Sequence, residues 1–295
     1  MTKTITLRSG DLALRLGCRG GVILDFRLGA GALMRPTPEG AAPGDSACFP
    51  LVPLGNRIRD NRFDFGGQTY RVTPNALPEP LHLHGAGWQA DWDLAGSDQS
   101  SARLIHRYDG PDLPHRYEAV QSFTLTPGSL TISLAVTNTG ADTLPFGIGW
   151  HPFFLPGAVL TAPAQGVWTE GPGHLPDGRT VLPEDLDFAQ PRPLPGRWIN
   201  NAFDGWSGHA RIDWPQRGLS LRISADPVFG CYQLYAPQDG APFAFEPMSH
   251  LPDALSRPGH GGLTPLAPGE SLAGSITLVP SSLPGAAGAV SGEKS

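Results

Sequence analysis

Apolar and polar residues alternate along much of this chain. The pattern is clearest over residues 131–137, Thr-Ile-Ser-Leu-Ala-Val-Thr, and it recurs over residues 24–28, 219–223 and 272–279. Successive side chains of a β-strand point to opposite faces of its sheet, so a period of two predicts strands with one buried face. Turn sequences such as Asn-Thr-Gly at 138–140 follow these segments closely, as expected for antiparallel sheets.

Prolines and glycines limit the length of any helix in this sequence. The 295 residues contain 32 prolines and 38 glycines. A proline inside a helix removes a hydrogen bond and clashes with the preceding turn, and the long proline-free stretches 81–110 and 196–214 lack a 3.6-residue period. Residues 183–188 are expected to form one helical turn. The sequence therefore predicts an all-β protein, a large antiparallel β-sandwich with few short helices.

No internal repeat and no linker divides the chain. All-β sandwiches often exceed 200 residues as one unit, so the length allows one large domain. Small and polar residues fill the last part of the sequence. We expect a single domain over residues 1–282 and a disordered tail over residues 283–295.

Charge and composition exclude several classes of protein. The formal net charge is −6 and there is no basic run, which excludes a nucleic-acid partner. Lys3 and Lys294 are the only lysines, so the body of the protein has no amine for Schiff-base chemistry. The cysteines Cys18, Cys48 and Cys231 lack metal-site spacing. Because neither a signal peptide nor a membrane-spanning segment is visible, we expect a soluble, cytoplasmic protein without a membrane partner.

A histidine in an apolar frame is the first candidate for chemistry. Residues 147–154 read Gly-Ile-Gly-Trp-His-Pro-Phe-Phe, with His151 between glycines, a proline and three aromatic residues. The proline fixes the backbone and the aromatic side chains exclude water. An imidazole titrates near neutrality and is suited to general acid/base catalysis. A core histidine bonded to a backbone carbonyl is the alternative.

A glutamate in an otherwise apolar strand is the second candidate. Glu246 follows Phe-Ala-Phe and precedes a proline. Desolvation by the phenylalanines should raise its pKa toward the range useful to a general base, unless the carboxylate finds a partner. An exposed strand glutamate fits these neighbours poorly.

Two further segments contain candidate binding residues. Residues 56–62 contain three arginines; a solvated surface is the usual explanation, although the five donors of Arg57 suit hydroxyl or carboxylate partners. In His82-Leu-His84-Gly, a strand would place both imidazoles on one face, but no further ligand completes a metal shell. We expect His84 to face a ligand and Trp88 to offer a flat apolar surface for a sugar, with a core tryptophan as an equally weighted alternative.

Together these segments resemble the aldose 1-epimerase (galactose mutarotase) family. The resemblance covers residues 10–280 and rests on four blocks in the family's order: Asn56-Arg57-Ile58 followed by Phe63-x-Phe65-x-Gly67-x-x-Tyr70, Leu83-His84-Gly85, Gly149-x-His151-Pro152-Phe153-Phe154, and Glu246-Pro247. It implies a galactose mutarotase-like supersandwich with a sugar cleft on one sheet. The expected partner is a small aldose, bound by a monomer or homodimer that needs neither metal nor cofactor.

The resemblance also implies catalytic roles. Glu246 would take the proton from the C1 hydroxyl of a sugar, and His151 would give a proton to the ring oxygen, so that the pyranose opens and recloses as the other anomer. His84 and Arg57 would hold the ring oxygen and hydroxyl groups. Glu246 and His151 should then face one cleft about one C1–O5 unit apart, without direct contact.

One position departs from the family's pattern. Asn200 stands where the family more often has an aspartate that binds sugar hydroxyls, and an amide offers no charge. Asp204, four residues on, is expected to compensate. Two alternatives stay open: a non-catalytic carbohydrate-binding or sensing module, and a hexose-6-phosphate 1-epimerase whose phosphate is bound by Arg57, Arg59 and Arg62.

Overall fold

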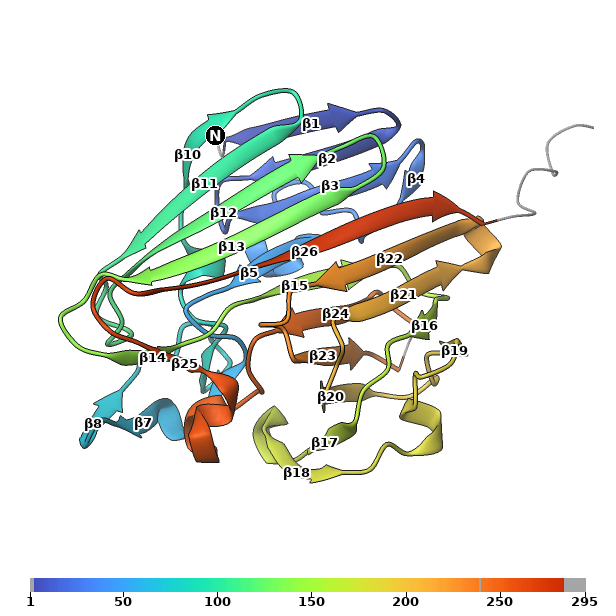
Figure 1. Cartoon of the computed structure of the whole chain (residues 1–295). Coiled ribbons are helices and arrows are strands. Elements are labelled where there is room, and N and C mark those ends of the chain that lie inside the picture. The colour runs from blue at the N-terminus through green and yellow to red at the C-terminus, as the bar shows by residue number, and fades with distance from the viewer. Residues whose placement is uncertain (1–2, 239, 284–295) are drawn as a thin grey trace, which may run out of the picture.

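Two large antiparallel β-sheets pack against each other in the computed structural model, which describes residues 3–238 and 240–283 (Figure 1). The first has eleven strands, in the order β1 (Thr4–Ser9), β2 (Leu12–Gly17), β3 (Val22–Leu28), β5 (Cys48–Leu51), β15 (Gly149–Phe154), β24 (Phe243–Met248), β23 (Cys231–Ala236), β20 (Ile199–Asp204), β17 (Gly166–Glu170) and β18 (Pro176–Thr180), with β4 (Gly31–Ala32) paired to β3. The predicted all-β class is confirmed.

The second sheet has nine strands, of which β11, β12, β13 and β26 lie side by side in Figure 1. Its order is β10 (Asp93–Ser97), β11 (Ser101–Tyr108), β12 (Tyr117–Leu125), β13 (Leu130–Asn138), β26 (Ser271–Ser282), β22 (Leu219–Ala225), β21 (His209–Trp214), β16 (Val159–Thr161) and β19 (Arg192–Pro193). Three small sheets pair β14 (Leu144–Phe146) with β25 (Thr264–Leu266), β6 (Arg57–Ile58) with β9 (His82–Leu83), and β7 (Arg62–Phe65) with β8 (Gln68–Arg71).

Helical segments are short wherever the chain is described, as the proline content predicts. They are the 3₁₀ turns η1 (Pro43–Asp45), η2 (Arg59–Asn61), η3 (Gly87–Gln89), η4 (Pro172–His174), η5 (Glu184–Leu186), η6 (Pro215–Arg217), η7 (Ala254–Ser256) and η8 (Pro258–Gly262). The turn expected at residues 183–188 is confirmed by η5. None of the helices in residues 3–238 and 240–283 has the length and hydropathy needed to span a bilayer.

The alternation of side chains assembles the core between the two sheets. In β13 the even-numbered residues from Leu130 to Val136 are buried, and they meet residues of the other sheet such as Phe26 in one apolar cluster that extends from Ile5 to Leu278. The single domain over residues 1–282 stays a prediction. Apart from Leu283, the tail predicted to be disordered, residues 283–295, lies outside the described residues.

The same alternation presents the candidate chemistry on the outer face of the eleven-stranded sheet. In β15, Trp150 and Phe154 belong to the core cluster, and the Trp150 Nε1–H donates to Gln121 Oε1 of the opposite sheet at 3.1 Å. His151 therefore points away from the core. In β24, Phe243 and Phe245 likewise face the core, which leaves Glu246 on the same outer face as His151.

Candidate active site

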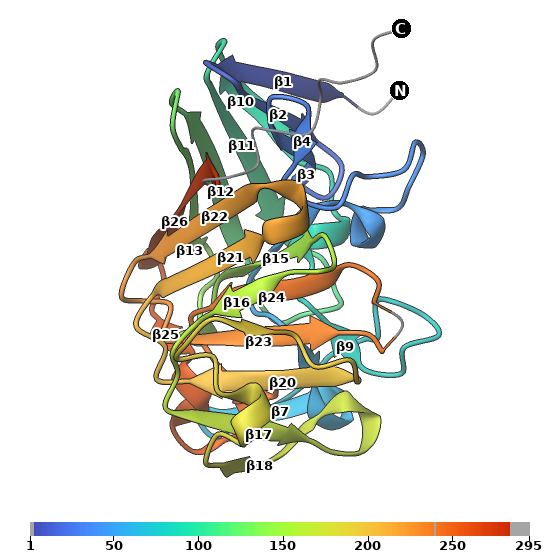
Figure 2. The same cartoon turned by 90° about the vertical axis from the view of Figure 1, so that its right-hand side faces the viewer.

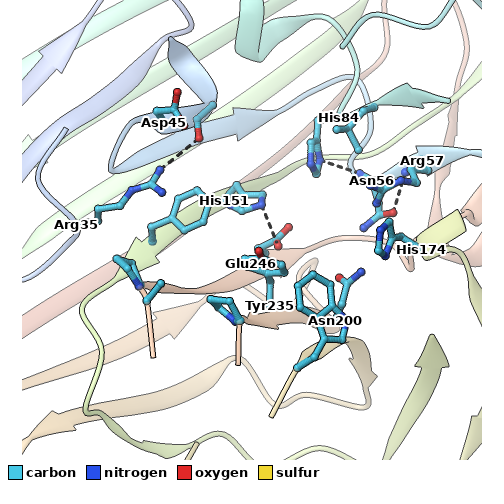
Figure 3. Close-up of a pocket in the computed structure, with 17 residues that line it drawn as sticks. Arg35, Asp45, Asn56, Arg57, His84, His151, His174, Asn200, Tyr235 and Glu246 are labelled. Carbon is cyan, nitrogen blue, oxygen red and sulfur yellow. Dashed lines mark hydrogen bonds and ion pairs between the residues drawn. The ribbon is translucent and has the colours of Figure 1, made fainter. Parts of the chain in front are cut away.

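The candidate acid and base lie on neighbouring central strands. The register of β15 and β24 pairs Gly149 with Met248 and Phe153 with Ala244, so His151 falls opposite Glu246. The His151 Nε2 lies 3.2 Å from the Glu246 Oε1 (Figure 3). The expectation that His151 and Glu246 would be separated by one C1–O5 unit is wrong. Side chains directly opposite each other on adjacent strands have Cβ atoms only about 5 Å apart, which brings the imidazole and the carboxyl into direct contact.

Burial shifts both titrations toward the neutral forms. The exposed fractions of His151 and Glu246 are 8% and 2%. Desolvation lowers the pKa of His151 to about 3, and it raises the pKa of Glu246 well above its ordinary value, against the positive charge of Arg57. The direction expected for Glu246 is thus correct. Both shifts favour the neutral imidazole and the neutral carboxyl over their charged forms.

Rings on three sides fix the His151 imidazole. Phe49 of β5 stacks on it with ring centroids 4.5 Å apart, and the Phe153 ring lies at 4.6 Å. His84 approaches edge-on at 5.3 Å. These contacts leave the imidazole one edge toward Glu246. The second Glu246 oxygen, Oε2, is buried and has no hydrogen-bond partner among the described residues.

His84 is held as a neutral hydrogen-bond donor. The backbone N–H of Asn56 donates to His84 Nδ1 at 3.1 Å, which places the imidazole proton on Nε2. Burial lowers the pKa of His84 well below its ordinary value. The prediction that His82 and His84 share one strand face is wrong: β9 ends at Leu83, and His84 turns away with a φ of 60°.

Arg57 is oriented by an acidic residue. Its Nη2 and Nε donate to Glu79 Oε2 at 2.7 and 3.1 Å, and β6 pairs with β9, so the Arg57 and His84 segments lie side by side. In return, Arg57 holds the pKa of Glu79 below its ordinary value although burial acts the other way. Sequence reasoning missed Glu79, because nothing in Leu-Pro-Glu-Pro indicates a distant partner.

An open polar cavity of about 460 Å³ surrounds these groups, within the range of small-molecule sites. It is lined by Arg35, Gly44, Asp45, Asn56, Arg57, Leu83, His84, His151, Phe153, His174, Trp198, Asn200, Tyr235, Pro237, Ala241, Pro242 and Glu246. Five of the seven predicted site residues are therefore in one place: Glu246, His151, His84, Arg57 and Asn200.

Trp88 and Asp204 do not line this cavity, and their predicted roles are corrected. The Trp88 ring is buried behind the site against Phe49, and its Nε1–H donates to the Leu83 carbonyl at 3.1 Å. It is the core tryptophan of the alternative. Asp204 lies about 13 Å along β20 from Asn200, and it is bound by Arg179 at 2.7 and 2.8 Å.

Several lining residues gave no sequence signal. Arg35 lies over the Phe153 ring at 3.7 Å and donates to the Ser46 carbonyl at 2.6 Å. Trp198, 41% exposed, provides the flat aromatic surface that was expected of Trp88. Its exposure could not be read from a sequence without a clear period. Within the described residues, no cluster of three or more histidine, cysteine or acidic side chains could hold a metal ion.

The fold is a galactose mutarotase-like β-sandwich, and its polar cavity contains a histidine in contact with a glutamate. A profile of the aldose 1-epimerase family matches residues 3–278, and the chain belongs to this family. Membership supports an epimerase, an isomerase that binds a sugar.

Relatives extend over nearly the whole chain. The uncharacterized protein YphB of Escherichia coli K12 is 41% identical over 283 residues, which cover 92% of this chain and 97% of that protein. A crystal structure from E. coli K12, provisionally assigned as an aldose 1-epimerase, has a TM-score of 0.92 at 38% identity, with 96% and 100% of the two chains covered. A Caenorhabditis elegans GalM/aldose epimerase homologue shares the fold with a TM-score of 0.83 at 17% identity, over 96% and 100%.

Proposed function

We propose that the protein is a cofactor-independent aldose 1-epimerase that interconverts the α and β anomers of a free hexose or related aldose. The contact between His151 and Glu246 at the floor of the cavity carries the proposal. Anomer exchange requires one group that removes a proton from O1 and one that protonates O5. A buried carboxyl–imidazole pair that shares one proton meets this requirement.

The first half of the reaction opens the ring. The proton of the pair moves across the 3.2 Å contact to His151 Nε2, which leaves Glu246 as a carboxylate. Glu246 then accepts the O1 proton while the imidazolium of His151 donates to O5. The C1–O5 bond breaks, C1 becomes an aldehyde, and the pair again holds one proton, now on Glu246. No charge is created or lost overall.

The second half reverses these transfers on the other face of the aldehyde. Rotation about C1–C2 turns the carbonyl over, the C5 hydroxyl oxygen attacks C1, and its proton returns to His151. Glu246 protonates O1. His84 Nε2–H, the Arg57 guanidinium and the Asn200 amide offer hydrogen bonds that keep the remaining hydroxyls in place during the rotation.

Substitution of Glu246 by glutamine tests the proposal. Glutamine keeps the shape of the side chain but cannot accept a proton, so Glu246→Gln should lower kcat for mutarotation by about 10²–10⁴-fold. Polarimetry or NMR of freshly dissolved α-hexoses measures the rate, and circular dichroism checks the fold. Full activity of this variant would sink the assignment. A purified protein that binds aldoses without accelerating mutarotation would support the sensing module instead.

The three arginines of residues 56–62 do not favour a phosphorylated substrate. Arg57 is bound by Glu79 and Arg59 by Asp253, each pair at 2.7 Å, so both positive charges are compensated. Arg62 lies exposed at the start of β7 and does not line the cavity. We therefore expect kcat/KM for a free hexose to exceed that for its 6-phosphate, in the same assay with both sugars.

A further inference from the structure

The amide of Asn200 is fixed from both sides. Its Nδ2 donates to Glu170 Oε1 at 2.6 Å, and its Oδ1 accepts from Gln233 Nε2 at 2.6 Å. The ladder between β17 and β20 ends at the pair Trp168–Ala202, and Glu170 and Asn200 each lie two residues beyond this pair in their strands. Figure 2 shows the strands β23, β20 and β17 next to one another. A carboxylate can only accept, so the amide has one possible orientation.

The carboxylate of Glu170 binds all three residues of one wall of the cavity, which are Asn200, Trp198 and His174. Besides Asn200, it accepts hydrogen bonds from Trp198 Nε1 at 2.6 Å and from His174 Nδ1 at 2.5 Å. All three donors line the cavity, whereas Glu170 itself does not. Figure 3 places Asn200 and His174 near each other, across the view from Arg35.

His174 adopts an unfavourable backbone conformation beside this carboxylate. Its φ is 59°, in the left-handed region that non-glycine residues seldom adopt, directly after Gly173 in η4. Such strain persists where surrounding contacts impose it, and it is concentrated at ligand sites. The hydrogen bond to Glu170 and a contact with the Trp198 ring, with centroids 5.9 Å apart, hold this imidazole at the cavity.

We propose that Glu170 is a specificity-determining positioning residue: from the strand beside Asn200, its carboxylate fixes the amide and the two other donors that face the ligand. The inference rests on the proposed function. The negative charge lies on Glu170, one strand behind Asn200. The Asn200 amide therefore keeps one N–H and one oxygen lone pair for the ligand. The wall then recognises a pair of hydroxyl groups on an uncharged aldose, since it offers a donor and an acceptor instead of acceptors alone.

A double-substitution cycle tests this role of Glu170. Asn200→Asp places a second carboxylate where the Nδ2 donor lay 2.6 Å from Glu170, and the repulsion should raise the Kd for the aldose at least about tenfold at pH 8. Glu170→Gln should raise it about fivefold, since the three donors lose a charged acceptor. The combined variant again holds one carboxylate and one amide, so its Kd should return to within about threefold of the wild-type value.

The pH dependence separates this role from a merely structural one. As the pH falls from 8 to 5, the two carboxyls of Asn200→Asp can share one proton and restore a hydrogen bond, so the Kd ratio of this variant to wild type should shrink. The combined variant has no such carboxyl pair, so its ratio should change less with pH than that of Asn200→Asp. Calorimetry in a Glu246→Gln background removes turnover from both measurements.

Each outcome decides between the two proposals. Additive effects in the cycle, or a ratio that does not change with pH, would overturn the role of Glu170 while leaving the epimerase intact. Binding without mutarotation by the wild type would overturn the proposed function, and the cycle would still decide on Glu170. Failure of every tested hexose to bind the wild type would overturn both.

A second pair of variants covers the case in which Asn200→Asp does not fold. Glu170→Ala removes the acceptor altogether and should weaken aldose binding more than Glu170→Gln, by at least about tenfold relative to wild type. The melting temperature of each variant identifies loss of folding. Wild-type Kd values for both folded variants would contradict the proposal.

Discussion

Two glutamates of the same sheet, Glu246 and Glu170, are held in opposite ways. Each lies across a strand pair from its partner, which is His151 for Glu246 and Asn200 for Glu170. Burial raises the pKa of Glu246, and its Oε2 has no partner among the described residues. Burial acts on Glu170 too, but hydrogen bonds from His174, Asn200 and Trp198 outweigh it and hold its pKa below the ordinary value.

The difference separates reactivity from positioning. A carboxyl that is desolvated and incompletely hydrogen-bonded is destabilised as an anion and is ready to exchange a proton. A carboxyl that accepts three hydrogen bonds stays ionised and fixes its donors. The proposed roles follow this difference: Glu246 would act as the base at the centre of the sheet, and Glu170 would anchor a binding wall near its edge.

The largest expected effect concerns the floor of the cavity. His151→Asn removes the acid that protonates O5, so kcat for mutarotation should fall by about 10²–10⁴-fold while KM changes little. His106→Asn is the matched control, because His106 is also buried but lies in β11 beside Trp92, away from the cavity. A kcat for His151→Asn within twofold of wild type would exclude His151 as the acid.

The next prediction concerns stability against pH. Because the folded-state pKa of Glu246 is raised, its contribution to stability is present below its ordinary pKa of 4.5 and is lost as the pH rises toward the folded value. His151, with its pKa lowered to about 3, contributes above its ordinary value of 6.5 and loses that contribution as the pH falls. The His151 contribution is common to two proteins that both keep this histidine, so a comparison of wild type with a Glu246 variant isolates the Glu246 effect.

Glu246→Gln should therefore gain stability relative to wild type as the pH rises above 4.5. The difference in the free energy of unfolding should grow by up to about 1.4 kcal/mol per pH unit. Urea unfolding at pH 4.5, 5.5, 6.5 and 7.5 measures it. A constant difference between the two proteins over this range would mean that Glu246 is ionised in the folded state, and the contrast with Glu170 would disappear.

The floor of the cavity, His151 and Glu246, could be predicted from the sequence far better than the wall formed by Asn200, Trp198 and His174. Alternation identified strands such as β13, and apolar neighbours marked His151 and Glu246 as buried. Their direct contact was missed, because strands 95 residues apart reveal neither order nor register. At the wall, Asp204 was expected to compensate for Asn200, being near in sequence, whereas Glu170 binds Asn200 from the adjacent strand.

The two tryptophans teach the same lesson. Trp88, beside a glycine turn and His84, had the local pattern of a ligand-facing ring, yet it is buried in the core. Trp198 had no pattern, because its exposure depends on β20 lying between β23 and β17 near the edge of the sheet. The local sequence predicts which residues are buried and where turns occur. Which side chains line a cavity depends on the pairing of strands that are distant in the sequence.

A third prediction sharpens the contrast from the side of the wall. Trp198→Ala removes an exposed aromatic surface that packs edge-on against Tyr235 at 5.2 Å, so KM should rise by about fivefold to tenfold while kcat stays near wild type. Val181→Ala, which also truncates an exposed apolar side chain but outside the cavity, should leave both constants unchanged. A lower kcat at unchanged KM would place Trp198 with the floor instead.

The smallest effect is the stability counterpart at Glu170, and its sign is opposite to that at Glu246. A lowered folded-state pKa gives stability that is present above the ordinary pKa of 4.5 and is lost as the pH falls below it. Glu170→Gln should thus be less stable than wild type by about 1 kcal/mol at pH 7, since the half-buried carboxylate is partly screened by solvent. Urea unfolding at pH 7 and pH 4 should show the deficit shrink with acid. Glutamine should thus raise the free energy of unfolding at Glu246 and lower it at Glu170. A change of the same sign at both positions would refute the distinction between the two glutamates.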